Sequence, residues 1–194
     1  MSFLAETLAF NREFVQNRSY AEIPQSKYPK KKVLVVTCMD ARLVELLPRA
    51  MNLHNGDAKF VKTAGALISH PFGGAMRSIM VGVYQLGVEE ILVIGHHDCG
   101  MIGLRPKLVL ERAQTRGIPP ERLDTLKGAG IDLEGWLTGF DRVEEAVAHS
   151  VEMIRQHPLI PRDLPVHGLV VDPTTGQLEV LIDGYNMSRS RGAP

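Results

Sequence analysis

Two cysteines and one histidine have the residue types and positions needed to bind a metal ion. Cys38 directly follows the apolar run 33–37, while His96 and Cys99 follow the apolar run 91–95 with the spacing His-x-x-Cys. Two thiolates and one imidazole form a ligand set that suits Zn²⁺. The chain has no third cysteine, and three protein ligands leave a fourth coordination position open, as in catalytic zinc sites. The pattern predicts a zinc site of the catalytic kind.

The same cysteines allow two simpler interpretations. Small cysteine side chains are often buried for packing alone, and Cys38 and Cys99 both lie at predicted strand ends. A disulfide between them is less expected, because an isolated pair without Cys-x-x-Cys spacing in a reducing compartment is rarely oxidised. Packing therefore remains the alternative to metal binding at this stage.

An aspartate and an arginine follow the first cysteine, in the sequence Cys38-Met39-Asp40-Ala41-Arg42. A carboxylate two residues beyond a thiolate ligand is able to occupy the open zinc position or to accept the proton of zinc-bound water. Arg42 would then hold the carboxylate away from the metal. The simpler interpretation is that Asp40 caps a helix beginning at Ala41 while Arg42 is solvated. Capping and catalysis are compatible here.

Short apolar runs predict the strands that position these residues. Strands are predicted at 33–37, 58–62 and 91–95, and helices between them at 41–50, interrupted by Pro48, and at 71–88, closed by Gly87. Strands that alternate with helices predict an α/β fold, with a mostly parallel central sheet and helices on both faces. Ligands of such sheets bind beyond the carboxyl ends of the strands, where both cysteines lie.

The segments outside this centre are assigned to the same domain, so that residues 1–194 form one predicted domain. Residues 1–30 contain an amphipathic helix over the first seventeen residues, with Ser2 as its N-cap, followed by a linker. Residues 103–139 are rich in glycine, proline and charged residues. They are predicted to form an excursion from the main fold, with short helical pieces at 109–115 and 120–126.

The C-terminal third of the chain predicts a helix and a hairpin. Asp141 and Glu144 have the spacing of a capping box, and the apolar stripe that follows predicts a helix ending near Pro158. The runs 166–171 and 178–182 flank an Asp-Pro-Thr-Thr-Gly turn. They predict an antiparallel hairpin at the C-terminal edge of the sheet.

Composition excludes several classes of partner. Lys plus Arg and Asp plus Glu both number 22, so the formal net charge is zero, and no overall basic field favours nucleic acid or anionic lipid. Apolar runs are a few residues long, far short of the roughly 20 residues that cross a bilayer. The N-terminal segment lacks the pattern of a secretory signal, so a cytoplasmic protein is expected.

The paired motifs Cys38-x-Asp40-x-Arg42 and His96-x-x-Cys99-Gly100 resemble the signature of the β-class carbonic anhydrases, in particular their small prokaryotic branch. The resemblance runs from about residue 33 to residue 182. Besides the two motifs, it is carried by Ala64-Gly65, Trp136-Leu137, the segment 157–161 and the turn 172–176.

This resemblance implies an enzyme that reversibly hydrates carbon dioxide to bicarbonate by means of zinc-bound hydroxide. Zinc is then held by Cys38, His96 and Cys99, and Asp40 and Arg42 are the catalytic residues. The implied substrate pocket comprises Thr63, Ala64, Gly65 and Gly100. Many family members have Arg-Asn-Ala-Gly where this chain has Lys-Thr-Ala-Gly at 62–65. A homodimer or larger assembly is also implied, with the N-terminal helix lying across a partner subunit.

Two other functions remain open at the level of sequence. The same zinc site on this fold also hydrolyses carbon disulfide or carbonyl sulfide in a few relatives. A non-catalytic zinc-binding homologue is the second alternative, and Asp40 with Arg42 argues against it because structural zinc needs neither residue. Two thiolates place more negative charge on the metal than imidazoles do, so an alkaline pH preference is expected.

Overall fold

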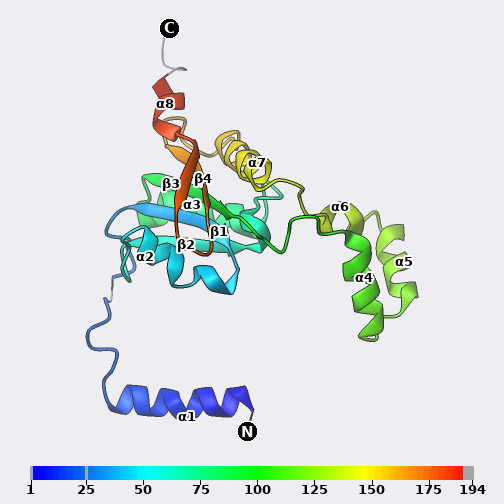
Figure 1. Ribbon diagram of the computed structural model, residues 1–194, viewed down its shortest axis with the longest axis horizontal. Helices are drawn as coiled ribbons and strands as arrows, with labels where there is room; N and C mark the ends of the chain where they lie inside the picture. Colours follow the sequence, from blue (N-terminus) through cyan, green and yellow to red (C-terminus); the bar gives the residue numbers. More distant parts are fainter. Residues whose placement is uncertain (1, 25, 190–194) are drawn as a thin grey trace.

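A five-stranded sheet forms the centre of the computed structural model, which describes residues 2–24 and 26–189 (Figure 1). The strand order is β2-β1-β3-β4-β5, and β5 alone runs antiparallel to its neighbour. The strands are β1 (Val33–Cys38), β2 (Ala58–Thr63), β3 (Glu90–His96), β4 (Val166–Val171) and β5 (Leu178–Ile182). The predicted α/β fold and its antiparallel edge hairpin are confirmed.

β1 lies between β2 and β3, so its side chains meet neighbours on both sides. Leu34, Val35 and Val36 are at most 1% exposed, which is why the run is apolar without alternation. Thr37 pairs with Ile94, and Cys38 pairs with Thr63. The carboxyl ends of these three parallel strands therefore share one edge of the sheet.

Helices cover both faces of the sheet, as predicted. On one face α3 (Gly74–Leu86) packs against β2, and α7 (Val143–Arg155) packs against β3 and β4. On the other face Leu43 and Leu47 are buried in a second apolar cluster. Leu43 belongs to a 3₁₀ turn, η1 (Ala41–Leu43), and Leu47 to α2 (Leu46–Ala50).

The segment 41–50 differs from the single helix that the sequence predicts. It divides between η1 and α2, and the break precedes α2 instead of falling at Pro48. Pro48 is the third residue of α2, where a backbone N–H has no partner within the helix. A proline at that position removes no helical hydrogen bond.

The predicted capping box at the start of α7 is wrong. The N-cap is Arg142, and no side chain caps the helix. Asp141 lies one residue before the N-cap, and its carboxylate pairs with Arg105 at 3.3 Å. The apolar stripe was the correct signal, because Val147, Val151 and their neighbours along the helix are buried against the sheet.

Two helical parts project from the sheet (Figure 1). α1 (Phe3–Gln16) has the predicted cap, since Ser2 accepts a hydrogen bond from the Ala5 amide, and the helix buries no residue. The excursion contains α4 (Pro106–Thr115), α5 (Pro120–Gly128) and α6 (Leu133–Leu137). The sequence did not predict α6 or the C-terminal α8 (Gly184–Arg189). Within the described ranges, every helix is too short or too polar to cross a membrane.

Candidate metal centre

Cys38, His96 and Cys99 meet at the carboxyl edge of the sheet. Cys38 ends β1, His96 ends β3, and Cys99 follows after a two-residue turn. One ligand atom from each residue lies within 4.8 Å of the other two, and all three residues are buried. The two Sγ atoms are 3.8 Å apart, far beyond the S–S bond length of about 2.05 Å, so the cysteines are free thiols. The cluster has the composition and spacing to hold a metal ion.

The ring of His96 is oriented for metal binding by a neighbouring backbone group. Its Nδ1 lies 2.8 Å from the carbonyl oxygen of His97. Because a carbonyl only accepts, Nδ1 must carry the proton, and Nε2 keeps its lone pair. Nε2 is buried and has no hydrogen-bond partner among the described residues. A buried lone pair of this kind is costly unless a ligand occupies it, and a metal ion fits that requirement.

The surroundings of the cysteine pair favour the thiolate form of Cys38. A hydrogen bond from the Cys99 thiol lowers the pKa of Cys38 to about 4, against the opposing effect of burial. The same contact and burial raise the pKa of Cys99. Burial lowers the pKa of His96, but Cys38, the His97 carbonyl and the charge of Asp40 together outweigh burial and raise it. Since the thiolate is the form that binds metals, Cys38 is ready to act as a ligand.

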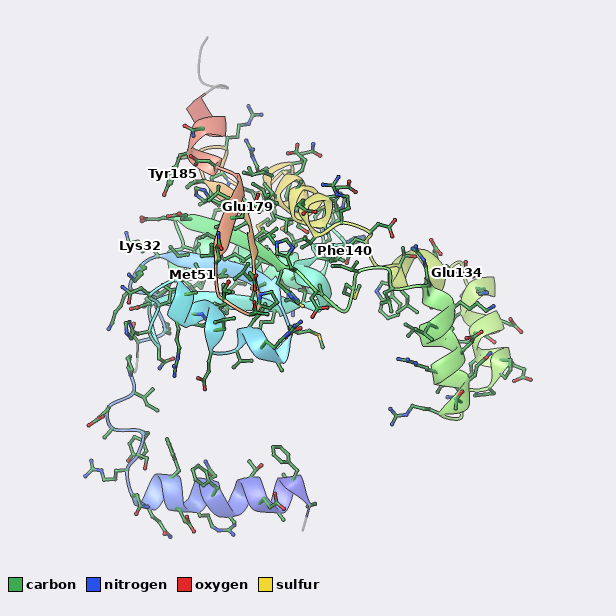
Figure 2. All side chains as sticks on the ribbon, viewed as in Figure 1. Lys32, Met51, Glu134, Phe140, Glu179 and Tyr185 are labelled. Atoms are coloured by element: carbon green, nitrogen blue, oxygen red, sulfur yellow. The ribbon has the colours of Figure 1, made fainter. Side chains whose placement is uncertain are left out.

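Gly65 supplies a further contact to the thiolate. Its backbone N–H donates to Sγ of Cys38 at 3.4 Å. The residue has φ +72°, and an added Cβ would lie 2.7 Å from the ring of Phe140. Figure 2 shows Phe140 where the excursion joins the body of the molecule. Positive φ and this close approach both require glycine.

The other residues of the predicted substrate pocket are less directly placed. Thr63 lies beside Cys38 in the sheet register, and its buried Oγ1 has no hydrogen-bond partner within residues 2–24 and 26–189. Ala64 is exposed. Gly100 follows Cys99, and a Cβ at Gly100 would meet no atom within 4 Å. Two surface cavities, of about 460 and 340 Å³, are lined by other residues.

Asp40 and Arg42 form a tight ion pair next to the cluster. Arg42 Nε donates to Oδ1 of Asp40 at 3.0 Å, and Nη2 donates to Oδ2 at 2.9 Å. Oδ1 also accepts the Arg42 amide, so Asp40 is the N-cap of η1 as well. The hydrogen bonds and charge of Arg42 lower the pKa of Asp40 to about 2. The predicted cap is therefore confirmed, while Arg42 is paired with Asp40 instead of being only solvated. A catalytic role of Asp40 stays a prediction.

Sequence reasoning missed two contacts that shape this centre. One is the His97 carbonyl that orients His96, and the other is a second carboxylate on Arg42, that of Asp98 at 2.8 Å. A backbone carbonyl leaves no signature in residue type. Asp98 is visible in the motif, but its contact with Arg42 spans 56 positions.

The sequence model of a family described as Carbonic anhydrase matches residues 33–178. That span includes all three cluster residues as well as Asp40 and Arg42. The chain belongs to the β-class carbonic anhydrases. The family match covers the sheet from β1 to the first residue of β5 and every residue of the metal centre described above.

Relatives of known name support membership of the β-class carbonic anhydrases. The Bacillus subtilis protein named "Putative carbonic anhydrase YtiB" is 53% identical over 96% of this chain and 100% of its own. A carbon disulfide hydrolase of Acidithiobacillus thiooxidans is 31% identical over 86% of this chain and 85% of its own. The crystal structure of a β-carbonic anhydrase from Trichomonas vaginalis superimposes with a TM-score of 0.86 at 33% identity, covering 95% of this chain and 100% of that one.

Proposed function

We propose that this β-class carbonic anhydrase reversibly hydrates carbon dioxide to bicarbonate, with zinc held by Cys38, His96 and Cys99. The observation that carries the proposal is the position of Asp40. Its Oδ2 lies 3.8 Å from Nε2 of His96, yet both of its oxygens are held by Arg42. Because Arg42 holds this carboxylate beside the metal cluster, Asp40 does not act as a metal ligand. The fourth coordination position of the zinc is then open to water.

Zinc, when bound, supplies Lewis-acid chemistry that lowers the pKa of a coordinated water. The residues of the chain then orient the reaction. Asp40, ionised and fixed by Arg42, accepts a hydrogen bond from the attacking oxygen and so directs a lone pair of that oxygen at the carbon of carbon dioxide. The N–H of Gly65 remains engaged with Cys38, which holds that thiolate in place.

The remaining substrate contacts are assigned to the last residue of β2, to the turn that follows it, and to the residue after Cys99. The Thr63 hydroxyl is buried and finds no hydrogen-bond partner in the part of the chain that the structure describes. Ala64 and Gly65 follow Thr63 directly, and Gly100 follows Cys99. Short side chains leave room for a triatomic substrate near the metal, while the hydroxyl offers a donor to bicarbonate. These four residues form the proposed pocket.

The proposed working form is a cytoplasmic homodimer or a larger homo-oligomer. α1 supports this assembly, since Phe3, Leu4 and Phe10 are between 66% and 84% exposed and the helix buries no side chain within its own chain. Apolar surface of this kind is usually covered by a partner. A second copy of the chain, with α1 lying across it, would cover that surface.

Stopped-flow measurement of carbon dioxide hydration tests the proposed function. The protein is loaded with zinc, its metal content is quantified, and initial rates are measured from neutral to alkaline pH. We expect rates proportional to zinc content that rise toward alkaline pH, because two thiolates make the coordinated water harder to deprotonate. Zinc-replete protein without activity at any pH would contradict the proposal.

Carbon disulfide hydrolysis is the second candidate function. It is favoured by the 31% sequence identity between this chain and a carbon disulfide hydrolase, a protein named for its action on a sulfur analogue of carbon dioxide. The same zinc-loaded protein is assayed for sulfide release from carbon disulfide and from carbonyl sulfide. Sulfide release without carbon dioxide hydration would reassign the substrate and leave the metal centre unchanged.

A further inference from the structure

The guanidinium of Arg42 is held from two sides. One edge contacts Asp40, as described above. From the other side, Nη1 donates to Oδ2 of Asp98 at 2.8 Å, and Nη2 donates to the backbone carbonyl of Asp98 at 2.9 Å. Of the five N–H donors of an arginine side chain, four are used in these bonds. The guanidinium of Arg42 is therefore fixed both in position and in the orientation of its plane.

The backbone of Asp98 is adapted to this contact. Asp98 has φ +53°, in the left-handed region, which is uncommon for residues other than glycine but is tolerated by aspartate and asparagine. In this conformation the main-chain carbonyl and the side-chain carboxylate of one residue both reach Arg42. The turn between His96 and Cys99 thus offers two acceptors to a residue of the other motif.

We propose that Asp98 is a positioning residue that acts on Asp40 through Arg42. By fixing the far side of the guanidinium, it keeps Arg42 in the orientation that holds both oxygens of Asp40 and keeps that carboxylate from becoming a metal ligand. This inference rests on the proposed function for its catalytic consequence. The geometric part concerns only the contacts of Asp98, Arg42 and Asp40, and it holds for any substrate.

Stability alone does not account for this contact. The Asp98 side chain is 83% exposed and that of Arg42 is 40% exposed, and exposed ion pairs add little to folding stability. The effect of Asp98 is therefore expected in the orientation of Arg42 and in turnover. Zinc content and the melting temperature should change little.

Two substitutions separate the carboxylate from the backbone. Asp98→Gly tolerates positive φ and keeps the carbonyl contact while deleting the carboxylate. Asp98→Asn keeps both the backbone conformation and an acceptor oxygen. For zinc-replete protein we expect Asp98→Gly to lower kcat about fivefold to tenfold with KM nearly unchanged, the pattern of lost positioning, and Asp98→Asn to recover most of the loss.

Cobalt(II) substitution gives a readout that does not depend on the substrate. Entry of a carboxylate into the coordination sphere changes the visible absorption of the bound cobalt. We expect Asp98→Gly to shift the spectrum toward carboxylate coordination, and the shift to vanish when Asp40→Asn is added. Glu89→Ala is the matched control, because Glu89 is 67% exposed and pairs with Lys32 at 2.6 Å at the opposite end of the sheet.

The outcomes are distinguishable. Wild-type kcat and a wild-type cobalt spectrum in Asp98→Gly would overturn the inference. So would an equal loss or spectral shift in the Asp40→Asn background, because Asp98 would then act without Asp40. Wild-type protein inert toward carbon dioxide would refute the proposed function instead, and the cobalt spectra would still decide whether Asp98 positions Arg42 and Asp40.

Discussion

Oδ2 of Asp40 lies 3.8 Å from Nε2 of His96, while the same oxygen accepts a hydrogen bond from Arg42 at 2.9 Å. Nε2 is the atom that the tautomer of His96 leaves free for a metal. The carboxylate thus lies near the position that a metal on His96 would take, and Arg42 binds both of its oxygens. We expect the balance between these two contacts to decide how the centre responds to substitution.

Loss of either thiolate should remove the metal. Cys38→Ser and Cys99→Ser replace a strong thiolate ligand by a poor hydroxyl, so we expect zinc content to fall from about one per chain to a small fraction of that value. Metal analysis of dialysed protein measures it. His97→Ala is the control, because its side chain is exposed and only its backbone orients His96. Full zinc in both serine variants would contradict the assignment.

Asp40→Ala should separate catalysis from metal binding. The three ligands remain, so zinc content should stay near wild type. The acceptor that orients the attacking oxygen is lost, and we expect kcat/KM to fall by about 10² or more, roughly 3 kcal/mol of transition-state stabilisation. Stopped-flow hydration assays on protein of measured zinc content test this. Wild-type rates in zinc-replete Asp40→Ala would refute the role of Asp40.

Arg42→Ala should fail in a different way. Freed from its partner, Asp40 is able to bind the metal and displace water, so activity should fall while zinc stays bound. The loss should be most severe at lower pH, where little hydroxide is available to compete with the carboxylate. A pH series of initial rates against wild type shows the trend. A uniform loss at every pH would exclude this competition.

Removal of α1 should weaken association. Deleting residues 1–18 removes the exposed apolar residues of α1, and burial of one phenylalanine side chain stabilises an interface by roughly 1.5–3 kcal/mol. We expect a loss of at least about tenfold in the dimerisation constant, measured by sedimentation equilibrium. Phe10→Ser should show part of the effect and Arg12→Ser, on the same helix, none. An unchanged dimer after truncation would remove this role of α1.

Asp172 should make the β4–β5 turn sensitive to acid. Its Oδ1 accepts hydrogen bonds from the hydroxyl and amide of Thr174 and from the Thr175 amide, led by that hydroxyl, and these lower its pKa below the ordinary 3.8. A lowered folded-state pKa stabilises the fold above pH 3.8, and this stabilisation is lost as the pH falls through the lowered value.

Thermal melts of wild type and Asp172→Asn across pH measure this contribution. Wild type should melt higher at neutral pH, and the difference should shrink below pH 3.8. Because both proteins lose any bound metal over the same pH range, the difference isolates Asp172. A difference that is constant down to the lowest pH would show that the charge of Asp172 is not involved.

The sequence by itself determined the donor set and the edge of the sheet where it lies. Cys38, His96 and Cys99 are identified by residue type and spacing, and the apolar runs before Cys38 and His96 predict buried parallel strands. These signals are local, because the hydrophobic pattern of each strand or helix reflects the burial of that element alone. The carboxyl ends of parallel strands then bring both motifs together by topology alone.

Only the tertiary structure decided how the centre is held. The Gly65 amide reaches Cys38 across 27 positions, and Asp98 reaches Arg42 across 56. Local patterning also misplaced the start of α7, where the carboxylate of Asp141 pairs with Arg105 from the excursion instead of capping the helix. Such contacts depend on strand register and on single left-handed residues that turn a carbonyl or an amide toward its partner. Those geometries are fixed when the distant segments pack, so the pattern within any one segment does not contain them.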